Sequence, residues 1–254
     1  MRVIGVVHLK PLPGSPGYGG DMDAVLAAAT ADARAYSTGG ADALIVENFG
    51  DIPFFGGPVP AETIAAMTAA TLAVGRSVEL PLGINVLRND ARAALGIAAA
   101  AGARFIRVNV HAGAMATDQG VLEGRAAETM RLRAALSHEI LVLADVHVKH
   151  ARPLTDESLE DAACNLHHRA HADGVIVSGS ATGAATSLED LCRVRAVLPD
   201  AKLFAGSGVT TQHVAEVLRV ANGVIVGTAL KRDGDIDAPV DAKRVLDFVD
   251  AANS

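Results

Sequence analysis

The sequence has no tryptophan, and aromatic residues make up only 3% of its 254 residues. It is also short of basic charge, with 22 lysines and arginines against 29 aspartates and glutamates, which gives a formal net charge of −7. Proteins that bind nucleic acid use basic surfaces to neutralise phosphates, and single strands also stack on aromatic side chains. This composition therefore argues against a nucleic-acid partner.

Cysteine is equally scarce. Cys164 and Cys192 form no C-x-x-C pair, and although His167 and His168 follow Cys164, no second pair of ligands completes a zinc motif. We therefore expect neither a disulfide nor a zinc site. We expect two buried thiols in helices of a cytoplasmic protein, because thiols stay reduced in that compartment.

Long apolar runs are missing as well. The apolar stretch at the amino terminus is interrupted by His8 and Lys10, which makes it too short for a secretory signal. The alanine-rich run 91–103 is shorter than the roughly 18 residues that a membrane-spanning helix needs. We expect neither a signal segment nor a transmembrane helix.

Hydrophobic residues, by contrast, make up 50% of the chain and follow a regular pattern. Short runs rich in β-branched residues predict eight strands, at 3–7, 43–47, 82–86, 105–110, 140–146, 174–178, 202–205 and 223–226. Apolar residues at helical spacing follow each run and predict helices near 22–37, 61–74, 90–101, 125–136, 159–172, 188–198, 211–220 and 240–251.

Strands that alternate with helices require a parallel sheet with helical crossovers. Eight such units close into a (β/α)8 TIM barrel, a fold that routinely reaches about 250 residues as one domain. We therefore predict an α/β protein with a single barrel domain over residues 1–254, with a doubly wound open sheet as the alternative. In a barrel the active site lies where the carboxyl ends of the strands meet.

Polar side chains gather at the predicted strand ends. The candidates are His8, Glu47, Asn48, Asn85, Arg107, Asn109, His111, Asp145, His147 and Lys149. Alternate residues of a strand point the same way, so those at 107, 109 and 111 should share one face, as should those at 145, 147 and 149. These side chains would then face the barrel mouth. The alternative is a structural one, a buried salt bridge between Arg107 and Asp145 that closes the core.

Glycine-rich turns follow the last three predicted strands. Backbone amides in such turns converge on anions, and the loops after the seventh and eighth strands are the recurrent phosphate site of TIM barrels. The candidate phosphate-binding residues are Ser178, Gly179, Gly206, Ser207, Gly208, Gly227 and Thr228. A phosphorylated substrate follows as a hypothesis, although glycine also serves simply to permit tight turns.

Two loops on the same side of the predicted barrel stand out. Residues 112–124 form a connection longer than usual, which favours a lid that carries Asp118, Glu123 and Arg125 to the substrate; an oligomer contact or an ordered surface loop is the alternative. Residues 49–57 hold three of the six phenylalanines and would close a pocket or form an interface.

The chain resembles the BtpA family. The motifs that carry the resemblance are VVHLKPLPGSP (6–16), VENFGDIP (46–53), GINVLRND (83–90), FIRVNV (105–110), TDQG (117–120), ADVHVKH (144–150) and GSATG (179–183). The resemblance implies a barrel of the phosphate-binding type and a relation to photosystem I biogenesis, but no established reaction. Residues 40–44, which lead to Glu47, also resemble the tryptophan synthase α chain, whose strand-two glutamate is catalytic; the loop that follows departs from that enzyme.

We therefore expect an aldolase, lyase or isomerase that works beside the carbonyl of a phosphorylated sugar or similar metabolite. Such chemistry needs an acid and a base, for which Glu47 and Asp145 are the candidates. Lys149, beside His147, would form a Schiff base or clamp a developing enolate, and cationic neighbours and burial would lower its pKa. Arg107 would orient substrate oxygens, together with the other candidate side chains at the strand ends.

The remaining expectations concern partners. We predict no cofactor, although His8, Glu47, Asp145 and His147 would be the ligands of a divalent metal if one were bound. We expect a phosphorylated small molecule as substrate and a homo-oligomer as the assembly. The rival hypothesis is a barrel without catalytic activity that serves as an assembly factor and binds a protein or a cofactor.

Overall fold

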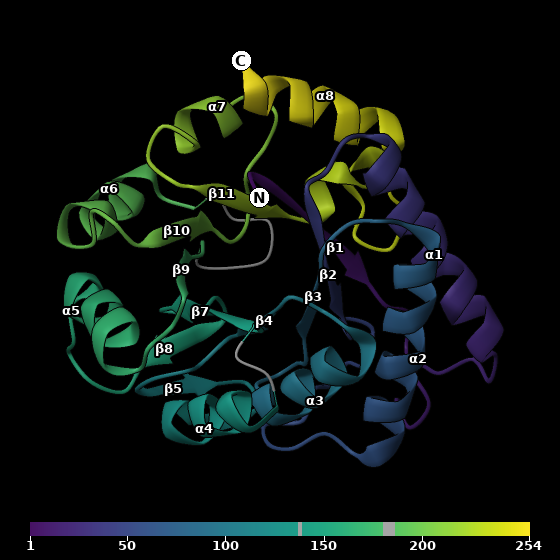
Figure 1. The fold of residues 1–254 in the computed structure, drawn as a ribbon, viewed down its shortest axis with the longest axis horizontal. Coiled ribbons are helices and arrows are strands. Elements are labelled where there is room, and N and C mark those ends of the chain that lie inside the picture. The colour runs from purple at the N-terminus through teal and green to yellow at the C-terminus, as the bar shows by residue number, and fades with distance from the viewer. Residues whose placement is uncertain (137–138, 180–185) are drawn as a thin grey trace.

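The computed structural model describes residues 1–136, 139–179 and 186–254. Eight parallel strands form a closed barrel in the order β1-β11-β10-β9-β7-β4-β3-β2 (Figure 1). Their bounds are β1 (Val3–His8), β2 (Ala43–Glu47), β3 (Leu82–Asn85), β4 (Phe105–Val108), β7 (Leu141–Val146), β9 (Gly174–Val177), β10 (Lys202–Ala205) and β11 (Gly223–Val226). The predicted TIM barrel is confirmed, and the open sheet is excluded because β1 pairs with both β2 and β11.

Helices surround this barrel (Figure 1). They are α1 (Met22–Thr38), α2 (Ala61–Ser77), α3 (Ala91–Ala101), α4 (Ala126–Leu136), α5 (Leu159–Cys164), α6 (Leu188–Val197), α7 (Val214–Val217) and α8 (Ala242–Asn253). Two of them are shorter than predicted. The helix expected at 159–172 is α-helical as far as Cys164 and continues as a π-helix, η1 (Asn165–Arg169), and the one expected at 211–220 is α-helical only at Val214–Val217.

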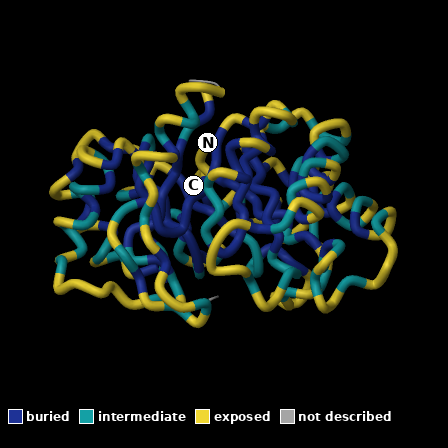
Figure 2. Tube along the Cα trace, turned by 90° about the horizontal axis from the view of Figure 1, so that it is seen from below, coloured by how far each residue is buried: buried dark blue, intermediate teal, exposed yellow. Residues whose placement is uncertain are grey.

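The core has two layers. Inside the barrel, Phe105 and Phe204 pack among small aliphatic side chains, and the Phe105 ring lies directly against Gly83, where any side chain would clash with it. A larger aliphatic layer fills the space between the barrel and the helices. Figure 2 shows the resulting buried centre and exposed periphery. Small residues suit this close packing, which accounts for the scarcity of aromatics.

The long connection after β4 is not an irregular lid. It folds into a hairpin of β5 (Ala114–Thr117) and β6 (Gly120–Glu123), and β5 also pairs with β8 (Ala151–Pro153), which follows β7. This antiparallel sheet joins the loop that follows β4 to the loop that follows β7. Backbone hydrogen bonds hold the hairpin in place, which fits an ordered loop better than a freely hinged one.

The cysteines differ from the prediction. Both thiols are free, as expected, but Cys164 is only half-buried and Cys192 is exposed, so the expectation of two buried thiols is wrong. Leu191, beside Cys192, takes the buried face of α6 instead. In the described ranges, no helix has both the length and the apolar character needed to cross a membrane.

Candidate active site

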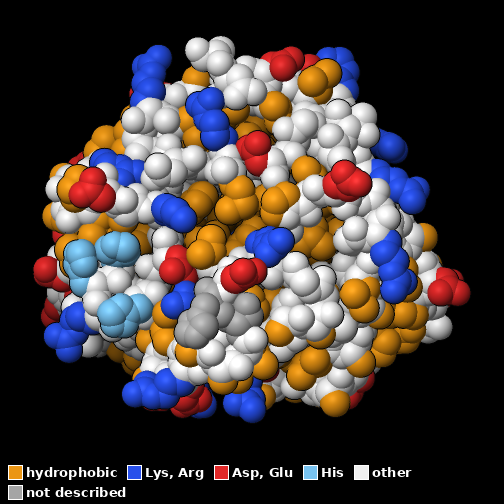
Figure 3. Space-filling model, in the orientation of Figure 1, with side chains coloured by type: hydrophobic (Ala, Val, Ile, Leu, Met, Phe, Trp, Pro, Cys, Tyr) orange, Lys and Arg blue, Asp and Glu red, His pale blue; other side chains and the backbone are white. Residues whose placement is uncertain are grey.

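Two adjoining cavities open at the carboxyl ends of the barrel strands. The first, of about 290 Å³, includes the turns after β10 and β11 in its lining, and we call it the glycine-lined cavity. The second, of about 480 Å³, includes Phe49, Pro53 and Phe54 in its lining, and we call it the phenylalanine-lined cavity. They share Glu47, Phe49, Arg107 and Lys149 as walls. Figure 3, in the orientation of Figure 1, views the barrel from its other end and shows charged side chains around an apolar centre.

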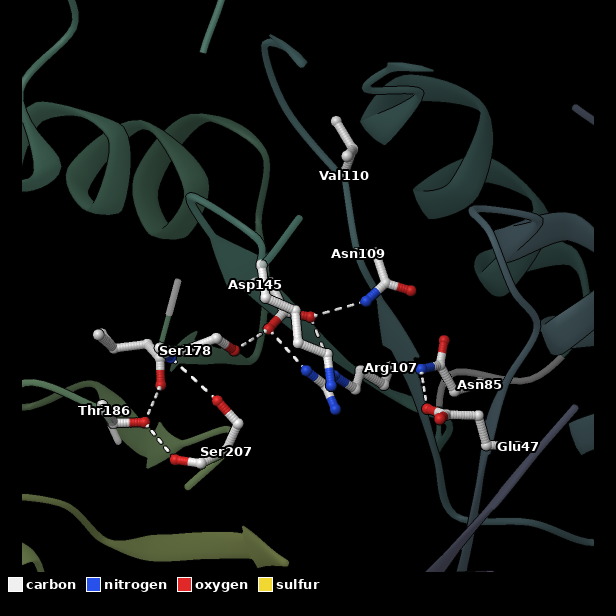
Figure 4. Close-up of polar contacts among 12 residues, drawn as sticks. Glu47, Asn85, Arg107, Asn109, Val110, Asp145, Ser178, Thr186 and Ser207 are labelled. Atoms are coloured by element: carbon white, nitrogen blue, oxygen red, sulfur yellow. Dashed lines mark hydrogen bonds and ion pairs between the residues drawn. The ribbon is translucent and has the colours of Figure 1, made fainter. Parts of the chain in front are cut away.

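Arg107 on β4 and Asp145 on β7 form a buried ion pair (Figure 4). The Arg107 guanidinium donates from Nε and one Nη to the two Asp145 oxygens at 2.9 and 2.8 Å. Asn109 Nδ2 and Ser178 Oγ donate to the same carboxylate at 3.2 and 2.7 Å. All acceptor sites of Asp145 are therefore occupied. The two side chains form the buried salt bridge that the sequence offered as the structural alternative for Arg107 and Asp145.

The ion pair keeps Arg107 charged despite burial. Burial by itself disfavours the guanidinium charge, but attraction and hydrogen bonds from Asp145 outweigh it, so the pKa of Arg107 lies above its ordinary value. A planar guanidinium held by two parallel hydrogen bonds is fixed in orientation. Arg107 therefore presents a fixed positive charge to both cavities.

Glu47 at the end of β2 is held differently. Asn85 Nδ2 donates to its Oε2 at 2.6 Å, and His8 Nε2 lies 3.7 Å from its Oε1. Burial lowers the pKa of His8 to about 4, even though Glu47 opposes this shift. At neutral pH the imidazole beside Glu47 is therefore uncharged.

Lys149 lies in the turn after β7 and lines both cavities. Burial lowers the pKa of its amine, and the positive charges of Arg107 and Arg88 lower it further against the opposing effect of Glu47 and Asp145. Among the described residues, no carboxylate lies within ion-pair distance of this amine. The pKa of Lys149 is thus lowered, as expected from the sequence. A larger fraction of this amine is therefore neutral and nucleophilic than in an ordinary lysine.

Most of the predicted phosphate-binding residues share one cavity. The glycine-lined cavity is lined by Gly206, Ser207, Gly208, Gly227 and Thr228. Ser178 and Gly179 lie behind them, where Ser178 binds Asp145 and the Gly179 amide donates to Ser207 Oγ at 3.0 Å. Residues 180–183 of the GSATG motif fall outside the described residues.

Besides Ser178, five predicted side chains do not line these cavities: Asn85 and Asp145, which bind the wall residues Glu47 and Arg107, and His147, His111 and Asn48. His147 has a φ of 48°, which breaks the strand alternation and turns its side chain into a separate cavity of about 780 Å³ beside α4 and α5. His111 follows the end of β4 and donates from Nε2 to the Ala170 carbonyl at 3.0 Å. Asn48 bridges two loops, because its Oδ1 accepts from the Leu87 amide at 2.7 Å. The strand parity expected for 111 and 147 is therefore wrong, because both residues lie beyond the ends of their strands.

The hairpin contributes Asp118 and Gln119 to the phenylalanine-lined cavity, as expected for Asp118. Glu123 and Arg125 line another pocket near α4 and do not reach the mouth. The sequence reasoning overlooked Gln119 and Arg88. Arg88 is buried, lines the same cavity and donates to the Lys149 carbonyl at 2.6 Å. The sequence signal for Arg88 is its charge directly after the apolar pair Val86 and Leu87, at the end of a predicted strand.

The residues that would hold a metal do not converge. His8 and Glu47 are adjacent, whereas His147 faces a different cavity. Over the ranges 1–136, 139–179 and 186–254, no three or more histidine, cysteine, aspartate or glutamate side chains form a group that could hold a metal ion.

A sequence model of the BtpA family matches residues 1–254. The chain belongs to the BtpA family. The photosystem I biogenesis protein BtpA of Synechocystis sp. is 47% identical over 98% of this chain and 87% of its own length. An uncharacterised protein of Pyrococcus furiosus is 48% identical over 99% of this chain and 95% of its own length. The resemblance inferred from the motifs is therefore confirmed.

Solved structures outside the BtpA family share its fold. Tryptophan synthase of Mycobacterium tuberculosis superposes with a TM-score of 0.64 at 18% identity, covering 100% of this chain and 93% of that one. Thiamine phosphate pyrophosphorylase of Pyrococcus furiosus superposes with a TM-score of 0.60 at 15% identity, covering 99% and 95%. At such identities the likeness establishes the barrel fold.

Proposed function

We propose that this protein is an enzyme that acts beside the carbonyl group of a phosphorylated sugar or similar metabolite, as an aldolase, lyase or isomerase. One observation carries the proposal. An amine with a lowered pKa, Lys149, and a carboxylate, Glu47, line the same cavity as the glycine turns at Ser207 and Gly227. A nucleophile, a base and an anion site within one cavity are the parts that such a reaction needs.

In the proposed reaction the neutral Lys149 amine attacks the substrate carbonyl carbon. The resulting carbinolamine takes up a proton at its hydroxyl group, loses that group as water and leaves a protonated Schiff base, whose positive charge draws electrons from the neighbouring carbon. Glu47 then accepts the proton from that carbon. In an aldol cleavage it instead accepts the proton of the hydroxyl group on the next carbon, which leaves as a carbonyl compound while the electrons of the broken C–C bond form an enamine. Return of the proton and addition of water release the product and restore the free amine.

The other side chains support these two groups. Asp145, first considered as a base, is given a positioning role, because its oxygens already bind Arg107, Asn109 and Ser178. Asn85 holds Glu47, and neutral His8 relays protons beside it. The amides of the turns at Ser207 and Gly227 bind the phosphoryl group.

Borohydride reduction tests the proposal. The protein is incubated with glyceraldehyde 3-phosphate or dihydroxyacetone phosphate, reduced, and analysed by peptide mass spectrometry. A reduced adduct on Lys149, lost in Lys149→Met and absent when borohydride is omitted, is the expected result. If both compounds label surface lysines as readily as Lys149, the Schiff-base step is wrong.

A second candidate function rests on the printed name of the Synechocystis relative, which assigns that protein to photosystem I biogenesis. On this hypothesis the barrel acts as an assembly factor. Anion binding separates the two hypotheses. Phosphate or sulfate that binds to the wild type and is lost on Gly227→Val favours the enzyme, whereas a mouth that binds no anion favours the assembly factor.

We also propose a cytoplasmic location and a homo-oligomeric state. The two free thiols fit a reducing compartment, and the exposed apolar side chains of Ile52 and Phe55 favour a contact between copies. Light scattering coupled to size-exclusion chromatography measures the oligomeric state. A monomer at micromolar concentration would contradict it.

A further inference from the structure

Side-chain amides and carboxylates form three pairs around the barrel mouth. Asn85 donates to Glu47, Asn109 to Asp145, and Gln119 to Asp118, with N···O distances of 2.6, 3.2 and 2.5 Å. Because a carboxylate only accepts, each amide must turn its nitrogen to the acid. Figure 4 shows this for Asn85 and Asn109, whose oxygens turn away from their partners.

These amide oxygens have no partner. Within the described part of the chain, no hydrogen-bond donor reaches Asn85 Oδ1, Asn109 Oδ1 or Gln119 Oε1, and all three atoms are buried. Asn109 and Gln119 belong to the lining of the phenylalanine-lined cavity, and Asn109 is only 2% exposed. A buried acceptor left without a donor loses the hydrogen bond that water would give it in the unfolded chain, which lowers the stability of the folded state. A ligand that donates hydrogen bonds would recover this free energy.

Both arginines of the same cavity are hydrogen-bonded within the protein, and the remaining amine, Lys149, is the proposed nucleophile. Arg107 donates two hydrogen bonds to Asp145, and Arg88 donates one to the Lys149 carbonyl at 2.6 Å. The Asp118 carboxylate also lines this cavity, and its negative charge repels anions. These contacts argue against a second phosphate here and favour a ligand rich in donors.

The apolar walls indicate the shape of that ligand. The rings of Phe49 and Phe54 lie with centroids 6.4 Å apart and an interplanar angle of 59°. Pro53 and Ile52 extend this wall at its outer edge, where Ile52 is 58% exposed. Aromatic and proline side chains pack well against flat rings and against the C–H faces of sugars.

We propose that the phenylalanine-lined cavity is a subsite for a ring that has an apolar face, carries O–H or N–H donors and is joined to the phosphorylated sugar. The assignment rests on the proposed function, since it places the phosphoryl group in the glycine-lined cavity. Glu47 and Lys149 stand in the wall between the two cavities, so the sugar carbons that react would lie between the two ends of the substrate. The ring is a nucleobase or a second sugar, which share this donor chemistry.

Calorimetric titration tests the subsite with three kinds of compound. Ribose 5-phosphate carries the phosphoryl group alone, nucleoside 5′-monophosphates add a base, and sucrose 6-phosphate adds a second sugar. Ring contacts are worth about 1–3 kcal/mol, so we expect at least one ring-bearing class to bind on the order of tenfold tighter than ribose 5-phosphate. The class that gains affinity identifies the ring.

A matched pair of variants checks where the ring binds. Phe54→Leu should remove most of the tenfold gain and leave ribose 5-phosphate binding unchanged. Phe55→Leu makes the same change at the next residue, which lies outside this cavity, and should keep the gain. Gln119→Leu, which removes an unpartnered acceptor, should weaken the ring-bearing compound alone.

The outcomes separate the two proposals. If ribose 5-phosphate binds and every ring-bearing class binds no tighter, the subsite is wrong and the phosphate site stands. Tighter binding of fructose 1,6-bisphosphate, unaffected by Phe54→Leu, would make the second cavity an anion site and overturn the inference. If no phosphorylated compound binds at all, the proposed function itself fails.

Discussion

Two buried carboxylates at the barrel mouth, Asp145 and Glu47, look alike in the sequence and differ in the structure. Each ends a strand, and they are 4% and 5% exposed. Asp145 accepts four hydrogen bonds from Arg107, Asn109 and Ser178. Within the described residues, Glu47 accepts one, from Asn85, and has His8 at 3.7 Å. Burial alone therefore does not distinguish the two carboxylates. The number of donors bound to each does, and it makes Asp145 the structural one, which we call the anchor.

The largest loss of stability should come from a substitution of Asp145, the anchor. Asp145→Asn leaves the Arg107 guanidinium buried without its counter-ion, and removal of one partner from a buried ion pair costs about 3–5 kcal/mol. Urea unfolding at neutral pH measures this loss. If Asp145→Asn is as stable as the wild type, Asp145 does not have the structural role that distinguishes it here from Glu47.

A double variant serves as the control. Replacement of both charges, Arg107→Met with Asp145→Leu, leaves no buried charge unpaired, so it should lose less stability than Asp145→Asn alone. Equal or greater loss in the double variant would assign the effect to packing at these positions.

His8 gives the second comparison, because it reports on the Glu47 side of the mouth through pH. Its pKa is about 4 in the folded protein and about 6.5 when unfolded, so the unfolded chain binds the extra proton first as pH falls. The contribution to stability is complete above about pH 6.5 and is lost progressively down to about pH 4. A shift of this size corresponds to about 3 kcal/mol.

Urea unfolding of the wild type and of His8→Asn between pH 7 and pH 4 measures this dependence. Asparagine does not titrate, so the gap between the two proteins should narrow, or change sign, towards low pH. Parallel stability curves would contradict the lowered pKa of His8.

The third prediction removes one donor from the anchor. Ser178→Ala deletes the 2.7 Å hydrogen bond to Asp145, and a bond to a charged group contributes about 1.5–3 kcal/mol. We expect a loss at the lower end of this range, because Arg107 and Asn109 remain. Ser254→Ala, which removes an exposed serine hydrogen bond at the carboxyl terminus, is the matched control and should be silent in the same unfolding assay.

The sequence was sufficient to predict the barrel, but it predicted only some of the side-chain positions at the barrel mouth. Strand alternation placed Arg107 and Asp145 correctly because both lie within strands, where side chains follow a period of two. It failed for His111 and His147, which lie past the strand ends, where a positive φ at His147 turns the chain. Hydrogen-bond saturation of Asp145 also could not be predicted, because its donors come from β4 and from Ser178, far apart in the sequence.

The smallest effect on stability should come from Glu47→Gln, and it sharpens the comparison most. Glutamine keeps an oxygen for the Asn85 donor, so we expect the free energy of unfolding to change by less than about 1 kcal/mol. The charge of Glu47 raises the pKa of Lys149, so its removal should lower that pKa further. Borohydride trapping of a phosphorylated aldehyde on Lys149 should then reach its half-maximum at a lower pH than in the wild type, even though the variant lacks the proposed base. An unchanged trapping profile would place Glu47 outside the electrostatic reach of Lys149 and remove it as the partner of that amine.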